Sequence, residues 1–117
     1  MSSVQQQMRK GTTTVVILKL LVDEGEPMYR YQIIRRLEEK SGGYFEFKEG
    51  LIYPRLHQME REGLLRSKWL GEAGTRRRKV YTVTEVGNRR LAEELAQWRS
   101  FTATLNQMLG IVQEPAA

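Results

Sequence analysis

The chain has 117 residues, of which 40% are hydrophobic and 28% are charged, a composition typical of one globular domain or of a small domain with an extended arm. It has no cysteine and one histidine, which excludes disulfides, thiolate nucleophiles and metal sites built from cysteine or from several histidines. No apolar run approaches the ~20 residues that span a bilayer, and the first residues carry no signal-peptide pattern, so we expect a cytoplasmic protein without a membrane partner.

Two helices are predicted in the first third of the chain. Residues 15–22 form an apolar run that the threonines at 12–14 can cap, and it favours a buried helix, although its β-branched residues also permit a strand. Residues 29–40 place Ile33 and Leu37 on one helical face, with charged residues outside. After this second helix, residues 44–47 alternate in polarity and are either a short strand or an extended connection.

A third helix, a hairpin and a fourth helix follow. Residues 49–62 are predicted to be helical, with Pro54 early in the helix, where its missing N–H costs least. Residues 64–70 and 79–84 are predicted strands joined by a flexible turn. The fourth helix is predicted to start near Thr84, a suitable N-cap.

The excess positive charge lies in the predicted hairpin. Residues 66–79 contain six basic residues and one acidic residue, which equals the whole net charge of +5, so the rest of the chain sums to zero. Four of the six are consecutive: Arg76, Arg77, Arg78 and Lys79. A solvated loop would explain such a run, but a cationic hairpin is also shaped to follow a phosphate backbone. Three helices followed by this hairpin predict a mainly α (α+β) winged helix-turn-helix with a two-stranded wing, in which residues 1–84 bind DNA.

In a winged helix the third helix enters the major groove of DNA. If Ile52, Leu56 and Met59 face the core, the opposite side presents a slim leading turn followed by polar residues. Gln58 can pair with adenine, Arg55 or Arg61 with guanine or phosphate, and Leu51 with a thymine methyl group. The expected contacts of this recognition helix are Gly50, Leu51, Tyr53, Pro54, Arg55 and Gln58. Tyr53 is as well explained as a core aromatic, and Gln58 as an ordinary surface residue.

The predicted last helix, residues 85–112, carries apolar residues at alternating spacings of three and four, and residues 113–117 form a loose tail. The seam consists of Leu91, Leu95, Trp98, Thr102, Leu105, Leu109 and Val112. Such a seam is typical of a helix that pairs with another helix, and a second copy of the chain is the simplest partner. The alternative is that this helix packs back on its own domain.

Several of these segments resemble the PadR-like family of transcriptional regulators, over roughly residues 10–109. The most specific match is Glu-Gly-Leu-Ile-Tyr-Pro-Arg-Leu at 49–56, similar to the family's Glu-Gly-Thr-Leu-Tyr-Pro-Ala-Leu. Residues 25–33 resemble its Tyr-Gly-Tyr-Glu-Ile entry to the second helix, and residues 76–87 its basic strand and Leu-Thr-x-x-Gly exit. Arg30 replaces the usual Gly and Leu51 the usual Thr or Ser, which suggests a different operator preference.

The resemblance implies a homodimeric repressor that binds double-stranded DNA at a dyad operator. It places Lys10 and Tyr31 beside the wing residues as flanking DNA contacts. In short members of the family the dimer interface can leave an opening for flat aromatic compounds, and Trp98 lies where it could stack on a small planar aromatic effector. The alternative is a packing role, which is the usual role of a tryptophan in such a seam. We expect no cofactor, no metal and no enzymatic activity. A winged-helix module that binds protein or RNA without specific DNA readout is the alternative function.

Overall fold

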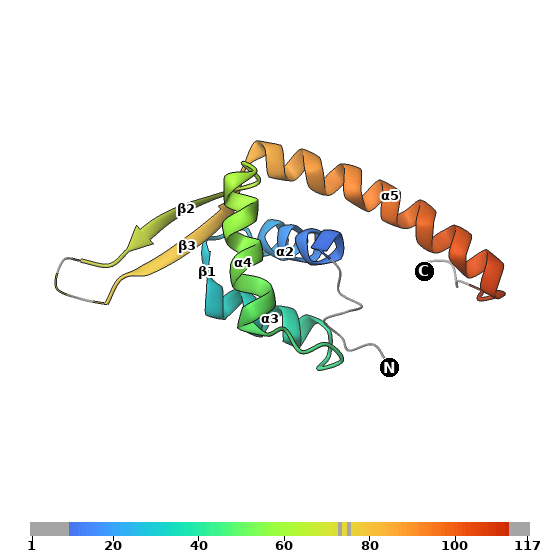
Figure 1. Cartoon of the computed structure of the whole chain (residues 1–117), viewed down its shortest axis with the longest axis horizontal. Helices are drawn as coiled ribbons and strands as arrows, with labels where there is room; N and C mark the ends of the chain where they lie inside the picture. The colour runs from blue at the N-terminus through green and yellow to red at the C-terminus, as the bar shows by residue number, and fades with distance from the viewer. Residues whose placement is uncertain (1–9, 73, 75, 113–117) are drawn as a thin grey trace.

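The structure is a computed structural model, and it describes residues 10–72, 74 and 76–112. The elements, in chain order, are α2 (Lys10–Glu24), β1 (Met28–Tyr29), α3 (Arg30–Lys40), α4 (Glu49–Arg61), β2 (Leu65–Leu70), β3 (Arg78–Val83) and α5 (Glu85–Leu109). Helices α2, α3 and α4 cluster together, the hairpin β2–β3 projects from them on one side, and α5 extends on the other (Figure 1). This arrangement confirms the predicted mainly helical winged helix-turn-helix. The predicted 113–117 tail lies outside the described residues.

The first helix is confirmed as a helix, but its predicted N-cap is wrong. Thr12, Thr13 and Thr14 lie inside α2 rather than at its start, and Thr13 and Thr14 are buried. The buried face of α2 therefore extends one turn further towards the N-terminus than the apolar run indicates, because threonine is compact enough to be covered by neighbouring helices.

The core forms where the three helices meet the hairpin. Its members are apolar side chains from every one of these elements, including Ile17, Leu18, Ile33, Leu37, Ile52, Leu56, Met59, Leu64 and Tyr81. The predicted inward faces of the second and third helices are thereby confirmed. Residues 44–47 form an irregular connection that begins with a bend rather than a strand, and Phe47 from this segment is buried in the core.

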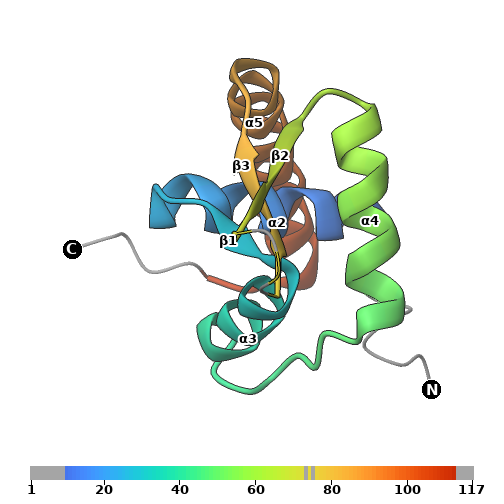
Figure 2. The same ribbon diagram turned by 90° about the vertical axis from the view of Figure 1, so that its left-hand side faces the viewer.

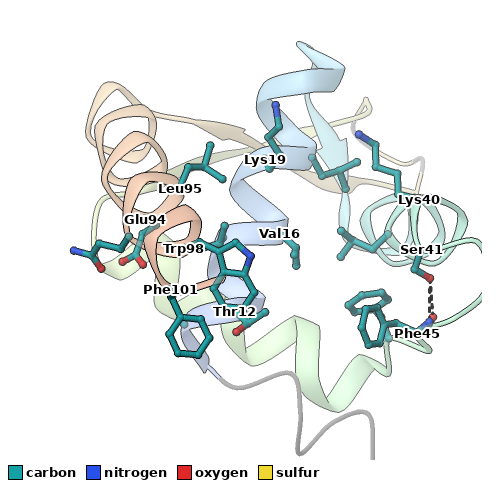
Figure 3. A pocket seen from close by; sticks show the side chains of 16 residues that line it. Thr12, Val16, Lys19, Lys40, Ser41, Phe45, Glu94, Leu95, Trp98 and Phe101 are labelled. Carbon is teal, nitrogen blue, oxygen red and sulfur yellow. Dashed lines mark hydrogen bonds between the residues drawn. The ribbon is translucent and has the colours of Figure 1, made fainter. Parts of the chain in front are cut away.

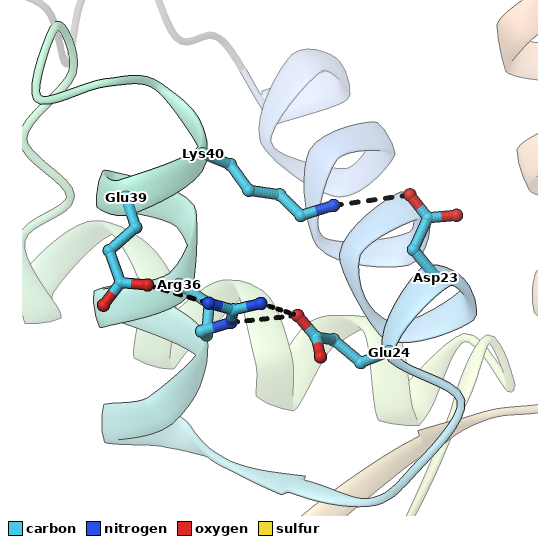
Figure 4. A network of polar contacts seen from close by, with 5 residues as sticks. All are labelled: Asp23, Glu24, Arg36, Glu39 and Lys40. Atoms are coloured by element: carbon cyan, nitrogen blue, oxygen red, sulfur yellow. Dashed lines mark hydrogen bonds and ion pairs between the residues drawn. The ribbon is translucent and has the colours of Figure 1, made fainter.

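Surface ion pairs join α2 to α3 on the far side of the core (Figure 4). The Arg36 guanidinium donates to Glu24 at 2.7 Å and to Glu39 at 2.8 Å, and Lys40 Nζ lies 3.4 Å from Asp23. Asp23 also pairs with Lys19 at 2.9 Å, and that hydrogen bond is the main reason why its pKa is lowered. The charges of these cations are thus balanced by acids on their own domain.

The sheet has three strands in the order β1-β3-β2, all antiparallel. β2 and β3 are the predicted wing, paired from Leu65↔Val83 to Leu70↔Arg78. β1 was not predicted, because two residues show no alternation, and it is a strand only through its pairing with β3. Figure 2, viewed from the hairpin side, shows α4 standing beside the strands.

Helix α5 starts as predicted but ends earlier. The hydroxyl of Thr84 caps it by accepting from the backbone N–H of Gly87 at 3.0 Å. At the other end Gly110 adopts a left-handed conformation (φ 73°), and the N–H of Ile111 donates to the carbonyl of Asn106 at 2.8 Å. This motif closes the helix at Leu109. The predicted extension to residue 112 is therefore wrong, and Val112 lies beyond the helix.

None of the helices, within the residues described, is sufficiently long and apolar to span a membrane.

Candidate nucleic-acid interface

The outer face of α4 has the composition expected of a helix that approaches a groove closely. Gly50, Pro54 and His57 are exposed, whereas Leu51, Tyr53 and Arg55 are half-buried on the flanks. Leu51 and Tyr53 also pack against the core, so each has a structural role in addition to any contact outside. Because proline has no N–H, Pro54 cannot donate to the carbonyl of Gly50 one turn earlier.

Gln58, the predicted adenine reader, is half-buried and already engaged within the helix. Its Oε1 accepts a hydrogen bond from Arg61 Nη2 at 2.6 Å. The amide N–H₂ of Gln58 is not used in that bond, and the same contact orients the exposed Arg61 side chain. Gln58 and Arg61 therefore form a coupled polar pair on the third turn of α4.

The four consecutive cations of the wing differ in their surroundings. Arg76, Arg77 and Arg78 are exposed, and the Arg78 guanidinium lies 4.5 Å from the centre of the Tyr29 ring. Lys79 is half-buried instead: its Nζ lies 3.2 Å from Glu60 Oε1 and 5.6 Å from the centre of the Tyr81 ring. Lys79 thus pairs within its own domain, while the three arginines stay exposed to solvent.

Glu60, near the C-terminal end of α4, is bonded to both strands of the wing. One carboxylate oxygen accepts from the hydroxyl of Ser67 on β2, and the other pairs with Lys79 on β3. The hydrogen bond from Ser67 is the main cause that lowers the pKa of Glu60, with Lys79 also contributing. This carboxylate therefore fixes the wing against the candidate recognition helix.

The start of α3 lies between α4 and the wing. Arg30 places its guanidinium 4.4 Å from the centre of the Tyr53 ring, and Tyr31 is 49% exposed with Arg35 at 5.9 Å from its ring. Burial, followed by the nearby Glu49, raises the pKa of Tyr53. Lys10 is the first residue of α2, but its side chain lies outside the part of the chain that the structure describes.

Two residues of this surface, Arg30 and Glu60, were not assigned by the sequence prediction. Their partners come from segments 23 and 19 positions away, Tyr53 and Lys79, so no local pattern reveals the contacts. The sequence gives a weak indication for Glu60. An acidic residue near the end of the third helix, followed by a strand rich in cations, suggests an ion pair between the two elements.

A second feature, separate from α4 and the wing, is a groove of about 900 Å³ between α2, the end of α3 and α5 (Figure 3). Trp98 and Phe101 line it from α5, with ring centres 5.7 Å apart, and Phe45 and Phe47 line it from the opposite side. Lys19 and Lys40 lie at its edge. Among the described residues, no cluster of His, Asp or Glu could hold a metal ion.

The predicted seam of α5 divides into two parts. Leu91 is buried and Leu95 packs against the core, so this end of the helix packs on its own domain, as the alternative interpretation proposed. Trp98, midway along α5, lines the groove against α2 and is otherwise exposed. The C-terminal part of α5 extends past the rest of the domain (Figure 1). Leu105 and Leu109 are exposed, and the Thr102 hydroxyl donates to the carbonyl of Trp98 at 3.0 Å.

Comparison with known proteins identifies relatives of the chain. The family model described as the transcriptional regulator PadR-like family matches residues 17–93. The solved structure of a PadR-like transcription factor from Bacteroides fragilis is 33% identical, covers 92% of this chain and 99% of its own, and has a TM-score of 0.72. A PadR family transcription regulator from Clostridium difficile is 31% identical over 83% of this chain and 97% of its own, with a TM-score of 0.71.

A more distant structure, Bacillus subtilis PadR in complex with operator DNA, is 24% identical over 94% of this chain and 51% of its own. Its TM-score of 0.64 shows the shared fold. No curated protein sequence gives a significant match.

Proposed function

Because the chain belongs to the PadR-like family of transcriptional regulators, we propose that it is a homodimeric repressor that binds double-stranded DNA at a dyad operator. The observation that carries this proposal is the contact of α4 with the wing. Glu60 bonds α4 to both strands, so the recognition helix and the wing that carries the three exposed arginines are held side by side. DNA bound to one of these elements would lie within reach of the other.

On this surface α4 reads bases and the wing binds phosphates. Gly50 and Pro54 keep the leading turn of α4 slim, which allows it to enter the major groove. Arg55 and Gln58 carry donors for base edges, and Leu51 offers an apolar contact for a thymine methyl group. Arg76, Arg77 and Arg78 supply contacts to the sugar-phosphate backbone that position the protein without regard to sequence.

Selection of bound duplexes from a random DNA pool tests the function directly. A repressor of this kind recovers a palindrome whose half-sites are about 34–36 Å apart or a multiple of that spacing. Substituting Arg76, Arg77 and Arg78 together by Gln should weaken binding to every duplex and make the salt dependence shallower, by about 0.9 for each phosphate that the variant no longer neutralises. An enriched pool without a palindrome would favour the protein- or RNA-binding module, and a triple variant that binds like the wild type would remove the wing from the interface.

Repression itself is tested with a reporter gene whose promoter overlaps the selected palindrome. Expression of the protein should lower the reporter signal, and the triple arginine variant should restore it. An increase in the reporter signal would identify an activator instead.

The groove beside Trp98 supports regulation by a small planar aromatic effector. Aromatic rings from α5 and from the connection after α3 face it from two sides, which suits stacking with a flat ligand. Trp69 is the other tryptophan of the chain, so a Trp69→Phe variant makes Trp98 the sole indole. Planar aromatic dyes should quench its fluorescence and weaken DNA binding, and Trp98→Ala should abolish the effect on DNA. Binding that leaves DNA affinity unchanged would contradict an effector role.

A further inference from the structure

Arg30 occupies a fixed place between α4 and the wing. It is the first residue of α3 and directly follows β1, whose residue Tyr29 pairs with Val80 of the central strand. The backbone at this point is therefore held by the sheet on one side and by the helix on the other. The Cα atom from which the Arg30 side chain extends is therefore held in a fixed position.

Two guanidinium groups stack on tyrosines at this junction. Arg30 on α3 lies over Tyr53 of α4, with 4.4 Å from its Cζ to the ring centre. Arg78 on β3 lies over Tyr29, at 4.5 Å. Because Tyr29 and Arg30 are neighbours in the chain, the backbone at this junction links a stack on α4 to a stack on the wing.

The charge of Arg30 is oriented but is not balanced by an acid. No carboxylate of the described residues lies within ion-pair distance of it, although Glu49 lies near the Tyr53 ring on which it stacks. Arg36, one and a half turns further along α3, is different, since Glu24 and Glu39 both pair with it. A guanidinium that is stacked on one face keeps its edge donors free for a second partner.

Resting on the proposed DNA-binding function, we propose that Arg30 binds a backbone phosphate of the operator beside the major groove occupied by α4. The flat edge of a guanidinium matches two phosphate oxygens, and stacking on Tyr53 orients this edge before DNA arrives. Arg30 contacts the flank of α4 rather than its exposed leading turn, which places it at the groove edge, where phosphates lie. Its contribution is therefore to affinity and register, not to base preference.

The test compares the salt dependence of DNA binding for Arg30→Ala, Arg30→Lys and a control, Arg99→Ala. Arg99 is exposed on α5, so its loss changes the net charge equally without touching the proposed surface. On both the selected duplex and a scrambled duplex, Arg30→Ala should lower affinity several-fold and reduce the slope of log affinity against log salt by about 0.9. Arg30→Lys should keep the wild-type slope with weaker binding, because it keeps the charge but loses the bidentate edge, and Arg99→Ala should match the wild type.

The outcomes separate this inference from the proposed function. The role of Arg30 alone would be overturned if the wild type discriminates between the two duplexes but Arg30→Ala has the same salt dependence of binding as the wild type. If Arg30→Ala loses affinity for the selected duplex but not for the scrambled one, Arg30 contacts bases, and the assignment to a phosphate is overturned. A wild-type protein that binds neither duplex would end the proposed function itself. Thermal unfolding of each variant, expected to match that of the wild type, shows that the fold is kept.

Discussion

Glu60 is an acidic side chain that lies beside a cation of the wing, Lys79. A free carboxylate there would repel the phosphates of DNA. The bonds of Glu60 to Ser67 and Lys79 have two effects. They neutralise the acid locally, and they set the angle between α4 and the hairpin. Lys79, one of the four cations that the sequence assigns to DNA, is used for this purpose in the structure, and its contact with DNA stays a prediction.

The lowered pKa of Glu60 makes part of the folding stability depend on pH. A carboxylate whose pKa is lowered by folding stabilises the protein above its unfolded-state pKa, and this contribution is lost as the pH falls through the lower, folded-state value. Glu60→Gln should therefore be less stable than the wild type at about pH 7, and the difference should shrink towards about pH 3. Urea unfolding at the two pH values measures it.

Glu46→Gln is the matched control for this substitution. Glu46 is exposed and forms none of the ion pairs found in the described part of the chain, so its loss should leave the stability unchanged at either pH. A Glu60→Gln deficit that is the same at both pH values would contradict the ionic role of Glu60.

At the same scale, the sequence predicts the faces of α4 but not the contacts across elements. A period of 3.6 residues places Ile52, Leu56 and Met59 inwards, and the structure confirms it. The stacking of Arg30 on Tyr53 and the bonds of Glu60 depend on how α3, α4 and the wing meet in space. That geometry is set by packing of the whole core, which periodicity does not encode.

Helix α5 packs so closely against the start of the hairpin that the residue at their contact, Gly87, has no room for a side chain. Gly87 is buried, and a Cβ atom added to it would lie 2.2 Å from the carbonyl oxygen of Leu64 and 2.7 Å from a methyl carbon of Val83. The backbone of α5 can approach the start of the wing this closely only because residue 87 is glycine. Thr84 bonds the same region, since its hydroxyl donates to the carbonyl of Gly63 at 2.6 Å.

Gly87→Ala should lower the free energy of unfolding by about 1–3 kcal/mol, because the added methyl group forces α5 away from the hairpin. Chemical unfolding measures the change. Gly11→Ala is the control: it is also a helical glycine, but an added Cβ there meets nothing within 4 Å among the described residues outside its own stretch of helix. The stability should therefore stay the same or rise by up to about 1 kcal/mol. Equal stability of Gly87→Ala and the wild type would show that the contact can relax without cost.

Elements with strong local signals were predictable, and the exceptions have physical reasons. The hairpin and the start of α5 follow from β-branched residues and a threonine cap, and both are confirmed. β1 is missed because two residues become a strand only by pairing with β3. The end of α5 is missed because the apolar spacing continues to Val112, whereas the left-handed Gly110 stops the helix first.

At the scale of the whole molecule, α5 is longer than packing against its own domain requires. The longest dimension is 59 Å against 33 and 28 Å for the other two, and the C-terminal part of α5 extends along it away from the core (Figure 1). An apolar stripe remains exposed along α5, made of Trp98 and Phe101, which also line the groove, and of Leu105, Met108 and Leu109. The dimer of the proposed function would cover this stripe with a second copy of the chain.

We predict that the chain is a dimer of twice 13.6 kDa and that Leu105→Glu converts it to a folded monomer. In a two-fold interface the same position on both copies approaches the seam, so one substitution places two like charges in an apolar contact. Sedimentation velocity measures the mass. Circular dichroism should stay that of the wild type, because Leu105 is exposed and is not part of the hydrophobic core.

Gln107→Glu is the control for the dimer. The substitution adds the same negative charge as Leu105→Glu, but residue 107 lies on the opposite side of α5. It should remain dimeric. The monomeric Leu105→Glu should bind the full palindrome little better than a single half-site, because two linked recognition helices gain their affinity from acting together. A Leu105→Glu protein that sediments as a dimer would exclude this stripe as the interface, and a wild-type monomer that binds the palindrome would show that dimerisation follows DNA binding rather than preceding it.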